Sequence, residues 1–262
     1  MLVSHESPIS ILDESLTYND YDYALVHLFD EEGEEFEEYF NFFKRSLHAG
    51  RKVFLDNSIF ELGTSFNEDK YAEYCNSLGE INPENFYHIV PDALGDSAGT
   101  ISNFNQFTAR AVYGNIVGVA QGTTMDEVIE CFKFMALHAD VVAICFNYKF
   151  YGNGPNFWME GRQRLMSHLQ SLGLLDGIKI HLLGCSLPQE FKFYKDANIE
   201  IFSNDTSNPV LHGLKGIRYT NTGLISKDSQ KIIDFISAPV SQEKTENILY
   251  NVNKFKEINL LN

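Results

Sequence analysis

The chain has 262 residues, of which 44% are hydrophobic, and a formal net charge of −16. This length and composition fit one α/β barrel or two small domains around a large apolar core, and exclude a disordered or fibrous chain. The start has no basic region followed by an apolar run, and no uncharged apolar stretch approaches the roughly 18 residues of a membrane span, so we expect neither a secretory signal nor a membrane partner.

Short apolar segments rich in β-branched and aromatic residues alternate along the chain with amphipathic ones. Segments of this kind are typical of strands that are buried on both faces of a parallel sheet. The pattern predicts seven strands and, more weakly, an eighth, at residues 23–29, 52–56, 86–90, 115–120, 140–146, 179–184, 199–202 and 217–220.

Apolar residues at helical spacing predict a helix after most of these strands. Asn67, and Thr124 followed by Glu127, are predicted N-caps, and Pro188 suits the first position of a helix. The helices are expected at residues 34–48, 69–78, 99–112, 125–138, 157–172 and 188–197, with closing helices at 230–236 and 242–260.

Seven or eight βα repeats without a Pro- or Gly-rich linker predict the fold. They favour an α/β chain folded as a single (β/α)8 TIM-type barrel over residues 1–262. An open doubly wound sheet is the alternative, but no GxGxxG or phosphate-binding loop follows any strand. Residues 1–20 are expected to cap the floor of the barrel or to extend its first loop.

Cysteines and acidic residues narrow the class of protein. Cys75, Cys131, Cys145 and Cys185 form no CxxC pair, which indicates reduced thiols and argues against a zinc site or a disulfide framework, so we expect a cytoplasmic protein. Much of the excess of acidic over basic residues comes from residues 30–38, which we interpret as a solvated helix face. Such a charge is unfavourable for binding phosphates, but basic residues cluster elsewhere, so a local positive rim stays open.

Polar side chains follow several of the predicted strands at the point where each strand ends. These are Asp56, Asp92, Gln121 and Asp205. Each alone could be a turn or cap residue. Together they favour a functional site, because the carboxyl ends of the strands form the catalytic face of a TIM-type barrel.

Four short motifs occur at these strand ends in a recognisable order. Residues 56–61 resemble a DSGGFQ block, Asp92 matches the base-recognising aspartate of a motif like FDEC, residues 118–122 resemble GIVQGG, and residues 183–191 are similar to MGVGTPEDL. The chain thus resembles, over about residues 50 to 210, the queuine and archaeosine tRNA-guanine transglycosylases and their DNA-acting relatives of the DpdA type. The resemblance lies in short motifs rather than extended identity.

The chain departs from this family at several positions. Residues 57–59 replace Ser-Gly-Gly, and residues 145–147 replace a small GGL turn. The family's nucleophile block FDxxxPTR reads Phe-Ser-Asn-Asp-Thr-Ser-Asn-Pro here, so alignment on Phe202 places Ser203 at the nucleophile, whereas a two-residue shift places Asp205 there. The zinc ligands CxCxxC…H of the tRNA enzymes are absent, which favours a short, zinc-free relative.

The resemblance implies a base-exchange transglycosylase that replaces guanine with a 7-deazaguanine derivative and uses no metal or cofactor. Asp205 would attack the anomeric carbon and form a covalent sugar–enzyme intermediate. Asp56 would protonate the leaving base and deprotonate the incoming one. Asp92 would accept from N1–H and the exocyclic amine of a purine, and Gln121 would donate to O6.

Further residues are assigned to substrate binding on the same grounds. Gly122 would offer a backbone amide near the ring, and Ser58 would belong to the same group. Phe60 or Tyr148 would form an aromatic wall for a flipped base, with core packing as the other interpretation of each. For the phosphates the candidates are Lys149, Arg162 and Arg218.

The implied partners are a nucleic acid and a free 7-deazaguanine base. The missing zinc ligands and the small size favour DNA as acceptor, and tRNA is the close alternative. A homo- or hetero-oligomer is expected, since transglycosylases of this family often pair. The composition, rich in Asn, Ile and Phe, suggests an AT-rich genome such as that of a phage, in which case the location is the host cytoplasm.

Three other functions stay open at this point. A barrel hydrolase would use the same carboxylates with water as the acceptor. A non-catalytic paralogue would serve as a partner subunit, which the departures at Ser58, Ile59 and Ser203 favour. A metal hydrolase would use His27, His88 or His181, although histidines within strands are more often buried core residues.

Overall fold

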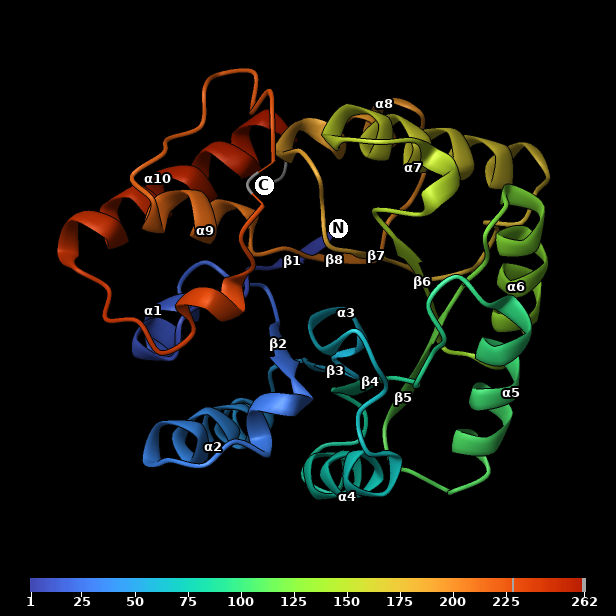
Figure 1. Ribbon diagram of the computed structural model, residues 1–262, viewed down its shortest axis with the longest axis horizontal. Helices are drawn as coiled ribbons and strands as arrows, with labels where there is room; N and C mark the ends of the chain where they lie inside the picture. The colour runs from blue at the N-terminus through green and yellow to red at the C-terminus, as the bar shows by residue number, and fades with distance from the viewer. Residues whose placement is uncertain (228, 261–262) are drawn as a thin grey trace. The chain divides into compact units, whose positions relative to one another are not determined.

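The computed structural model describes residues 1–227 and 229–260. This described chain has an α/β fold of the (β/α)8 TIM type, in which eight strands, parallel wherever their register is defined, alternate with helices (Figure 1). It divides into two compact units: the first unit comprises residues 1–20 and 145–262, and the second unit comprises residues 21–144. The strand order is β1-β8-β7 in the first unit and β6-β5-β4-β3-β2 in the second.

The second unit contains five strands and the helices that connect them. Its strands are β2 (Asp22–Leu25), β3 (Val53–Asp56), β4 (Phe86–Ile89), β5 (Asn115–Val119) and β6 (Val141–Cys145, whose last residue belongs to the first unit). Its helices are the 3-10 helix η2 (Val26–Phe29), α2 (Glu34–His48), α3 (Ile59–Leu62), α4 (Glu68–Gly79), α5 (Ser97–Thr108) and α6 (Met125–His138).

The described part of the first unit contains three strands together with α-helices and 3-10 helices. Its strands are β1 (Leu2–Ser4), β7 (Ile180–Leu183) and β8 (Ser203–Asp205). Its α-helices are α1 (Leu12–Ser15), α7 (Pro155–Ser171), α8 (Lys192–Asp196), α9 (Asn208–Leu214) and α10 (Gln242–Ile258). Its 3-10 helices are η1 (Ile9–Ile11), η3 (Lys149–Tyr151), η4 (Pro188–Glu190) and η5 (Ile232–Phe235).

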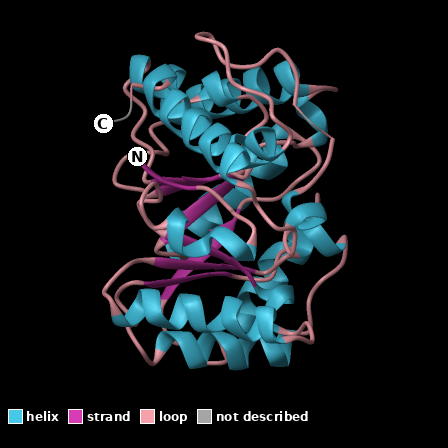
Figure 2. Ribbon diagram, turned by 90° about the vertical axis from the view of Figure 1, so that its left-hand side faces the viewer, coloured by secondary structure: helices cyan, strands magenta, loops and turns pink. Residues whose placement is uncertain are grey.

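Burial on both faces explains why the strands of the second unit are continuous apolar runs. Val53, Phe54 and Leu55 of β3 are all 0% exposed. Phe54 is in register with Tyr87 of β4, and the two rings stack with centroids 4.5 Å apart. Such cross-strand pairs fix the register of neighbouring strands, and with it the places where the strands end. Figure 2 shows how short the strands are beside the helices.

Helix boundaries follow the caps that the sequence predicts. The Asn67 side chain accepts from two backbone amides at the start of α4. Thr124 and Glu127 form a reciprocal capping box at the start of α6. Helix α2 begins with acidic residues in its first turn, where the helix dipole favours negative charge. The acidic residues of the segment 30–38 are exposed, which confirms the predicted solvated face.

The chain start and the last strand differ from the sequence prediction. Leu2–Ser4 is neither a cap nor a loop extension: it forms β1 and pairs with β8. Residues 217–220 form no strand and contribute only a bridge between Thr220 and Gly223. The last strand is Ser203–Asp205 instead of residues 199–202. Strands of three residues carry too little pattern to be located from sequence, because pairing with neighbouring strands defines them.

Some predicted elements are shorter or are divided. The strand expected at residues 23–29 ends at Leu25 and continues as η2. The helix expected at 188–197 is divided into η4 and α8, and the one expected at 230–236 is the 3-10 helix η5. The long helix expected at 242–260 is confirmed as α10, and its partner α9 packs so closely that a Cβ on Gly213 would lie 2.6 Å from the backbone nitrogen of Ile248.

A helix that crosses a membrane would need a long run of apolar residues. None of the helices in residues 1–227 and 229–260 has both the length and the apolar character for this.

Candidate functional site

The first cluster of polar side chains lies in the second unit, where β4 and β5 end. Asp92 follows β4 and is 3% exposed. Asn57 Nδ2 donates to its Oδ1 at 2.8 Å, and Gln121 Nε2 donates to its Oδ2 at 2.6 Å. The structure therefore brings together Asp92 and Gln121, as expected from the sequence, and adds Asn57, which donates to the other oxygen of Asp92.

The surroundings of Asp92 set its acidity and orientation. Burial raises the pKa of this carboxyl above its ordinary value, while the hydrogen bonds from Asn57 and Gln121 act in the opposite direction. Gln121 is itself fixed, because its Oε1 accepts from the Gly95 amide at 3.1 Å. The two carboxylate oxygens accept from Asn57 and Gln121, and a carboxylate has further lone pairs that can accept N–H groups.

A small cavity beside Asp92 limits where such a ligand could lie. It has a volume of about 10 Å³ and is lined in part by Asn57, Tyr71 and Asp92. This is about the space of one water molecule. A base that contacts Asp92 therefore has to lie outside this cavity.

Asp56 forms a separate contact group at the end of β3. Tyr23 Oη donates to its Oδ2 at 2.5 Å, and the Ser58 amide donates to its Oδ1. Tyr23 reaches this position from the neighbouring strand, where Leu25 is in register with Asp56. Asp56 is only partly buried, so it combines a fixed orientation with access to solvent.

Three further substrate-binding candidates lie in the second unit and differ in how far they are exposed: Ser58, Gly122 and Phe60. Ser58 is 0% exposed and left-handed at φ 60°, and its Oγ lies 3.4 Å from the His27 amide. A Cβ on Gly122 would lie 2.8 Å from the Val128 nitrogen, so the close approach of α6 requires glycine there. Phe60 is 40% exposed, which leaves its ring able to meet a ligand.

The second cluster lies in the first unit, around the last residue of β8. Asp205 Oδ1 lies 3.0 Å from His181 Nε2, and the Gly184 amide donates to both carboxylate oxygens at 3.2 Å. His181 and Ser203 are in register on β7 and β8, and His181 Nδ1 lies 2.8 Å from Ser203 Oγ. Ser203 and Asp205 are two residues apart on a strand, so both point to the side that His181 occupies.

The order of these three groups decides which of them can react. The carboxylate only accepts, so in a neutral ring His181 Nε2 donates to Asp205 and Nδ1 accepts from the Ser203 hydroxyl. Ser203 is 0% exposed, whereas the Asp205 side chain keeps 7% exposure at the strand end. The arrangement therefore presents a carboxylate, with the imidazole and the hydroxyl behind it, and does not present a serine nucleophile.

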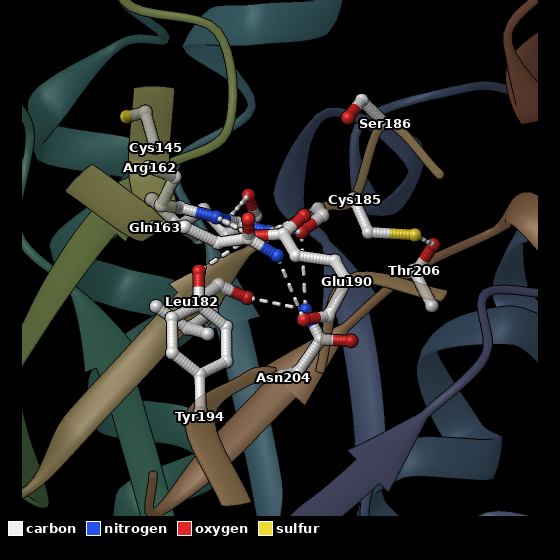
Figure 3. A network of polar contacts seen from close by, with 12 residues as sticks. Cys145, Arg162, Gln163, Leu182, Cys185, Ser186, Glu190, Tyr194, Asn204 and Thr206 are labelled. Carbon is white, nitrogen blue, oxygen red and sulfur yellow. Dashed lines mark hydrogen bonds and ion pairs between the residues drawn. The ribbon is translucent and has the colours of Figure 1, made fainter. Parts of the chain in front are cut away.

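A fully buried ion pair holds the end of β7 in place (Figure 3). Arg162 is 0% exposed and binds Glu190 through Nε at 2.6 Å, while Tyr194 Oη donates to the same carboxylate. The guanidinium also donates to the carbonyls of Leu183 and Gly184, each at 2.9 Å. This fixes Gly184, whose amide holds Asp205. The expectation that Arg162 contacts phosphate is therefore wrong, because its charge is used within the core.

Asn204 contributes to the same support from the other face of β8. Its Nδ2 donates to the Leu182 carbonyl at 2.6 Å and to the Gly184 carbonyl at 3.1 Å. Gly184 has φ +59°, and a Cβ there would lie 2.8 Å from Phe146 Cδ1, so both conformation and space require glycine.

Sequence reasoning missed several members of these two clusters. Asn57 belongs to a motif that the sequence singles out, but its bond to Asp92 spans 35 residues. The sequence leaves His181 open as a core histidine or a metal ligand. The available signal is that His181 lies two residues before the end of its strand, near the face where catalytic groups are expected. Tyr148, a candidate aromatic wall, is 5% exposed and stacks on Phe150, as expected for a core residue.

Groups of His, Cys, Asp and Glu that could hold a metal ion are not found among the described residues. The four cysteines are free thiols, and all are buried except Cys145, which is partly buried. No protein-family model matches the chain, and no curated protein matches it.

Proposed function

We propose that the protein is a nucleic-acid transglycosylase that exchanges guanine for a 7-deazaguanine derivative, with DNA as the favoured acceptor. The observation that carries this proposal is the position of Asp205. Its carboxylate lies at the carboxyl end of a strand in a TIM-type fold, where catalytic groups of this fold occur. His181 and the Gly184 amide hold it in one orientation, as a group that attacks a single carbon requires.

In this mechanism Asp205 attacks C1′ of the target nucleotide. A bond forms between the carboxylate oxygen and C1′ while the bond from C1′ to the guanine nitrogen breaks and leaves its electron pair on the base. Asp56 supplies the proton that neutralises the leaving base, and Tyr23 orients it. The incoming base then loses its proton to Asp56 and displaces Asp205, so two inversions give overall retention.

Asp92 and Gln121 take the part of base recognition. A guanine-like edge offers N1–H and an exocyclic amine, and Asp92 is a carboxylate whose lone pairs suit such donors. The buried position of Asp92 makes this selective, because a base that cannot donate there would cover the carboxylate without adding a hydrogen bond to it. Phe60 would stack on the base at the exposed edge of α3.

The proposal implies a chain that acts in the cytoplasm, in the host cytoplasm if a phage encodes it. A tRNA acceptor keeps the same chemistry with another polymer. The alternative of a non-catalytic partner subunit predicts binding without base exchange, and the hydrolase alternative predicts release of guanine without incorporation.

The test is incorporation of radiolabelled guanine into duplex DNA and, separately, into tRNA. We compare the wild type with Asp205→Asn, which keeps the shape of the side chain, and with the exposed control Asp176→Asn. We expect label in DNA, a loss of roughly 10⁴-fold or more in Asp205→Asn, and no loss in the control.

Three results would decide against this proposal or change it. Label in tRNA alone would change the substrate and keep the mechanism. Free guanine released without incorporation of label would replace exchange with hydrolysis. Full activity in Asp205→Asn would remove Asp205 from the reaction.

A further inference from the structure

The irregular segment between α9 and η5 is fixed at two points within the first unit. The Tyr219 amide donates to Asn251 Oδ1 at 2.8 Å, and Tyr219 Oη donates to Asn208 Oδ1. Further along, Gln189 binds the Leu224 backbone twice, with Nε2 donating to the carbonyl at 2.8 Å and Oε1 accepting from the amide at 3.2 Å. The segment up to Leu224 thus has a defined path.

This path brings Lys227 to the end of β7 and β8. Its Nζ lies 3.8 Å from the centroid of the Phe146 ring. Phe146 packs on Gly184, the residue whose amide holds Asp205. Lys227, Phe146, Gly184 and Asp205 therefore form a continuous row of neighbours, and the row ends at the proposed nucleophile.

The charge of Lys227 is not neutralised by direct contact. It forms no ion pair with any residue in the described part of the chain, although Glu6 and Asp205 act on it from a longer range. Burial is the largest effect and lowers its pKa from the ordinary value of a lysine. A half-buried ammonium on an aromatic ring is held in position and has lost part of its hydration, which strengthens its attraction for an anion.

The chemistry at Asp205 identifies the anion. If Asp205 bonds to C1′ of a nucleotide, the phosphates on the same sugar come close to the carboxylate. Arg162, the cation that supports this strand end from behind, is fully buried in its pair with Glu190 and cannot reach them. Lys227 is only partly buried and has no carboxylate bound to it within the described residues, so its charge is the one at this strand end that is left for a ligand.

We propose that Lys227 binds a backbone phosphate of the nucleotide whose base is exchanged, and thereby places C1′ on Asp205. This inference rests on the proposed function, since it takes the polymer to be a nucleic acid. The segment 219–227 then brings the Lys227 side chain to the site. Gln189 and Phe146 determine where its ammonium group lies.

The chain offers a matched control for this proposal. Lys179 Nζ lies over the Phe202 ring at 5.5 Å, so it also is a lysine on an aromatic ring. It precedes β7 and lies at the opposite end of that strand from Gly184. Lys179→Gln removes the same charge and the same type of contact without touching the proposed site.

The experiment measures the dissociation constant of the full chain for guanine-containing duplex DNA, and separately for tRNA, over a series of salt concentrations. The logarithm of the association constant falls linearly with the logarithm of the salt concentration. Each phosphate contact that is lost reduces the magnitude of this slope by about 0.9 on duplex DNA and about 0.7 on single strands. We expect Lys227→Gln to lower the slope by about this amount, Lys227→Arg to keep it, and Lys179→Gln to leave it unchanged.

Exchange of labelled guanine is measured on the same preparations, so that the two proposals can fail separately. A lower slope in Lys227→Gln with no exchange in the wild type would support the phosphate contact and overturn the transglycosylase. Exchange in the wild type with an unchanged slope in Lys227→Gln would overturn the phosphate contact alone. Wild-type protein that binds neither polymer would overturn both.

Discussion

Tyr71 in the second unit and Arg162 in the first have the same structural task and perform it with different chemistry. Each lies on a helix, is buried, and donates to the carbonyls at strand ends. The Tyr71 hydroxyl lies 3.0 Å from the Leu55 carbonyl and 2.7 Å from the Ile89 carbonyl and shares its one proton between them. Arg162 donates to the carbonyls of Leu183 and Gly184 and needs the carboxylate of Glu190 as a counter-ion.

The neighbouring functional groups differ in the same way. In the second unit, neutral amides and a phenol orient Asp92 and Asp56. In the first unit, a histidine and a backbone amide orient Asp205 in front of a buried ion pair. Removing a neutral hydroxyl leaves only neutral acceptors without their donor, whereas a buried charge without its partner is more costly. The comparison therefore indicates that the first unit depends much more strongly on single side chains.

The largest effect on stability is expected for Arg162→Met. The substitution leaves Glu190 buried without its partner and frees two carbonyls, so the free energy of unfolding should fall by about 3–5 kcal/mol. Urea unfolding followed by circular dichroism measures this. The double variant with Glu190→Met should regain part of the loss, because the orphaned charge is gone. A loss below about 1 kcal/mol in the single variant would contradict the comparison.

The next effect concerns the support of Asp205 by His181. A hydrogen bond to a charged group contributes about 1.5–3 kcal/mol, so His181→Phe should lower kcat for base exchange by about 10- to 150-fold with little change in KM. His181→Gln, which keeps an N–H donor, should recover part of the rate. Ser203→Ala removes only the donor to the imidazole and should cost about 10-fold or less. A rise in KM as large as the fall in kcat would indicate a general disturbance of the site instead of a loss of positioning.

A smaller loss of stability is expected for Tyr71→Phe, which tests the comparison of Tyr71 with Arg162 directly. The variant keeps the ring and removes the hydroxyl that donates to two buried carbonyls, so unfolding should become easier by about 1–3 kcal/mol. Tyr74→Phe is the control, because its hydroxyl donates to the Phe29 carbonyl near the surface and should matter less. If Tyr71→Phe lowered the free energy of unfolding as much as Arg162→Met, the two side chains would not differ in their contribution to stability.

The smallest change is a displacement of the pH profile of base exchange. Asp92 must accept hydrogen bonds from the base, so activity is lost as the pH falls and the carboxyl is protonated. Since burial raises the pKa of Asp92, this loss of activity should begin at a higher pH than the titration of an ordinary aspartate would give. Asn57→Ala removes a hydrogen bond that lowers this pKa and should move the acid limb of kcat/KM to higher pH.

Asn67→Ala provides the control for this profile, since Asn67 caps α4 and does not bind Asp92. An acid limb that stays in place when Asn57 is replaced would show that another group titrates.

The fold class and most helices could be predicted from the sequence, because local signals determine them. Thr124 and Glu127 lie three residues apart and specify where α6 begins. The buried part of a strand such as β3, residues Val53, Phe54 and Leu55, shows as an unbroken apolar run. The strand β1 could not be found in this way, since Leu2–Ser4 becomes a strand only by pairing with β8, about 200 residues later in the chain.

For the candidate site, the sequence by itself determined which polar residues follow the strands: Asp56, Asp92, Gln121 and Asp205. Only the tertiary structure decided their partners. His181 and Asp205 are 24 residues apart, and Asn57 and Asp92 are 35 apart. Strand register brings these pairs together, and register depends on packing between elements rather than on the local pattern of either one. The same reason explains why Lys227 has no signal in the sequence and a defined place in the fold.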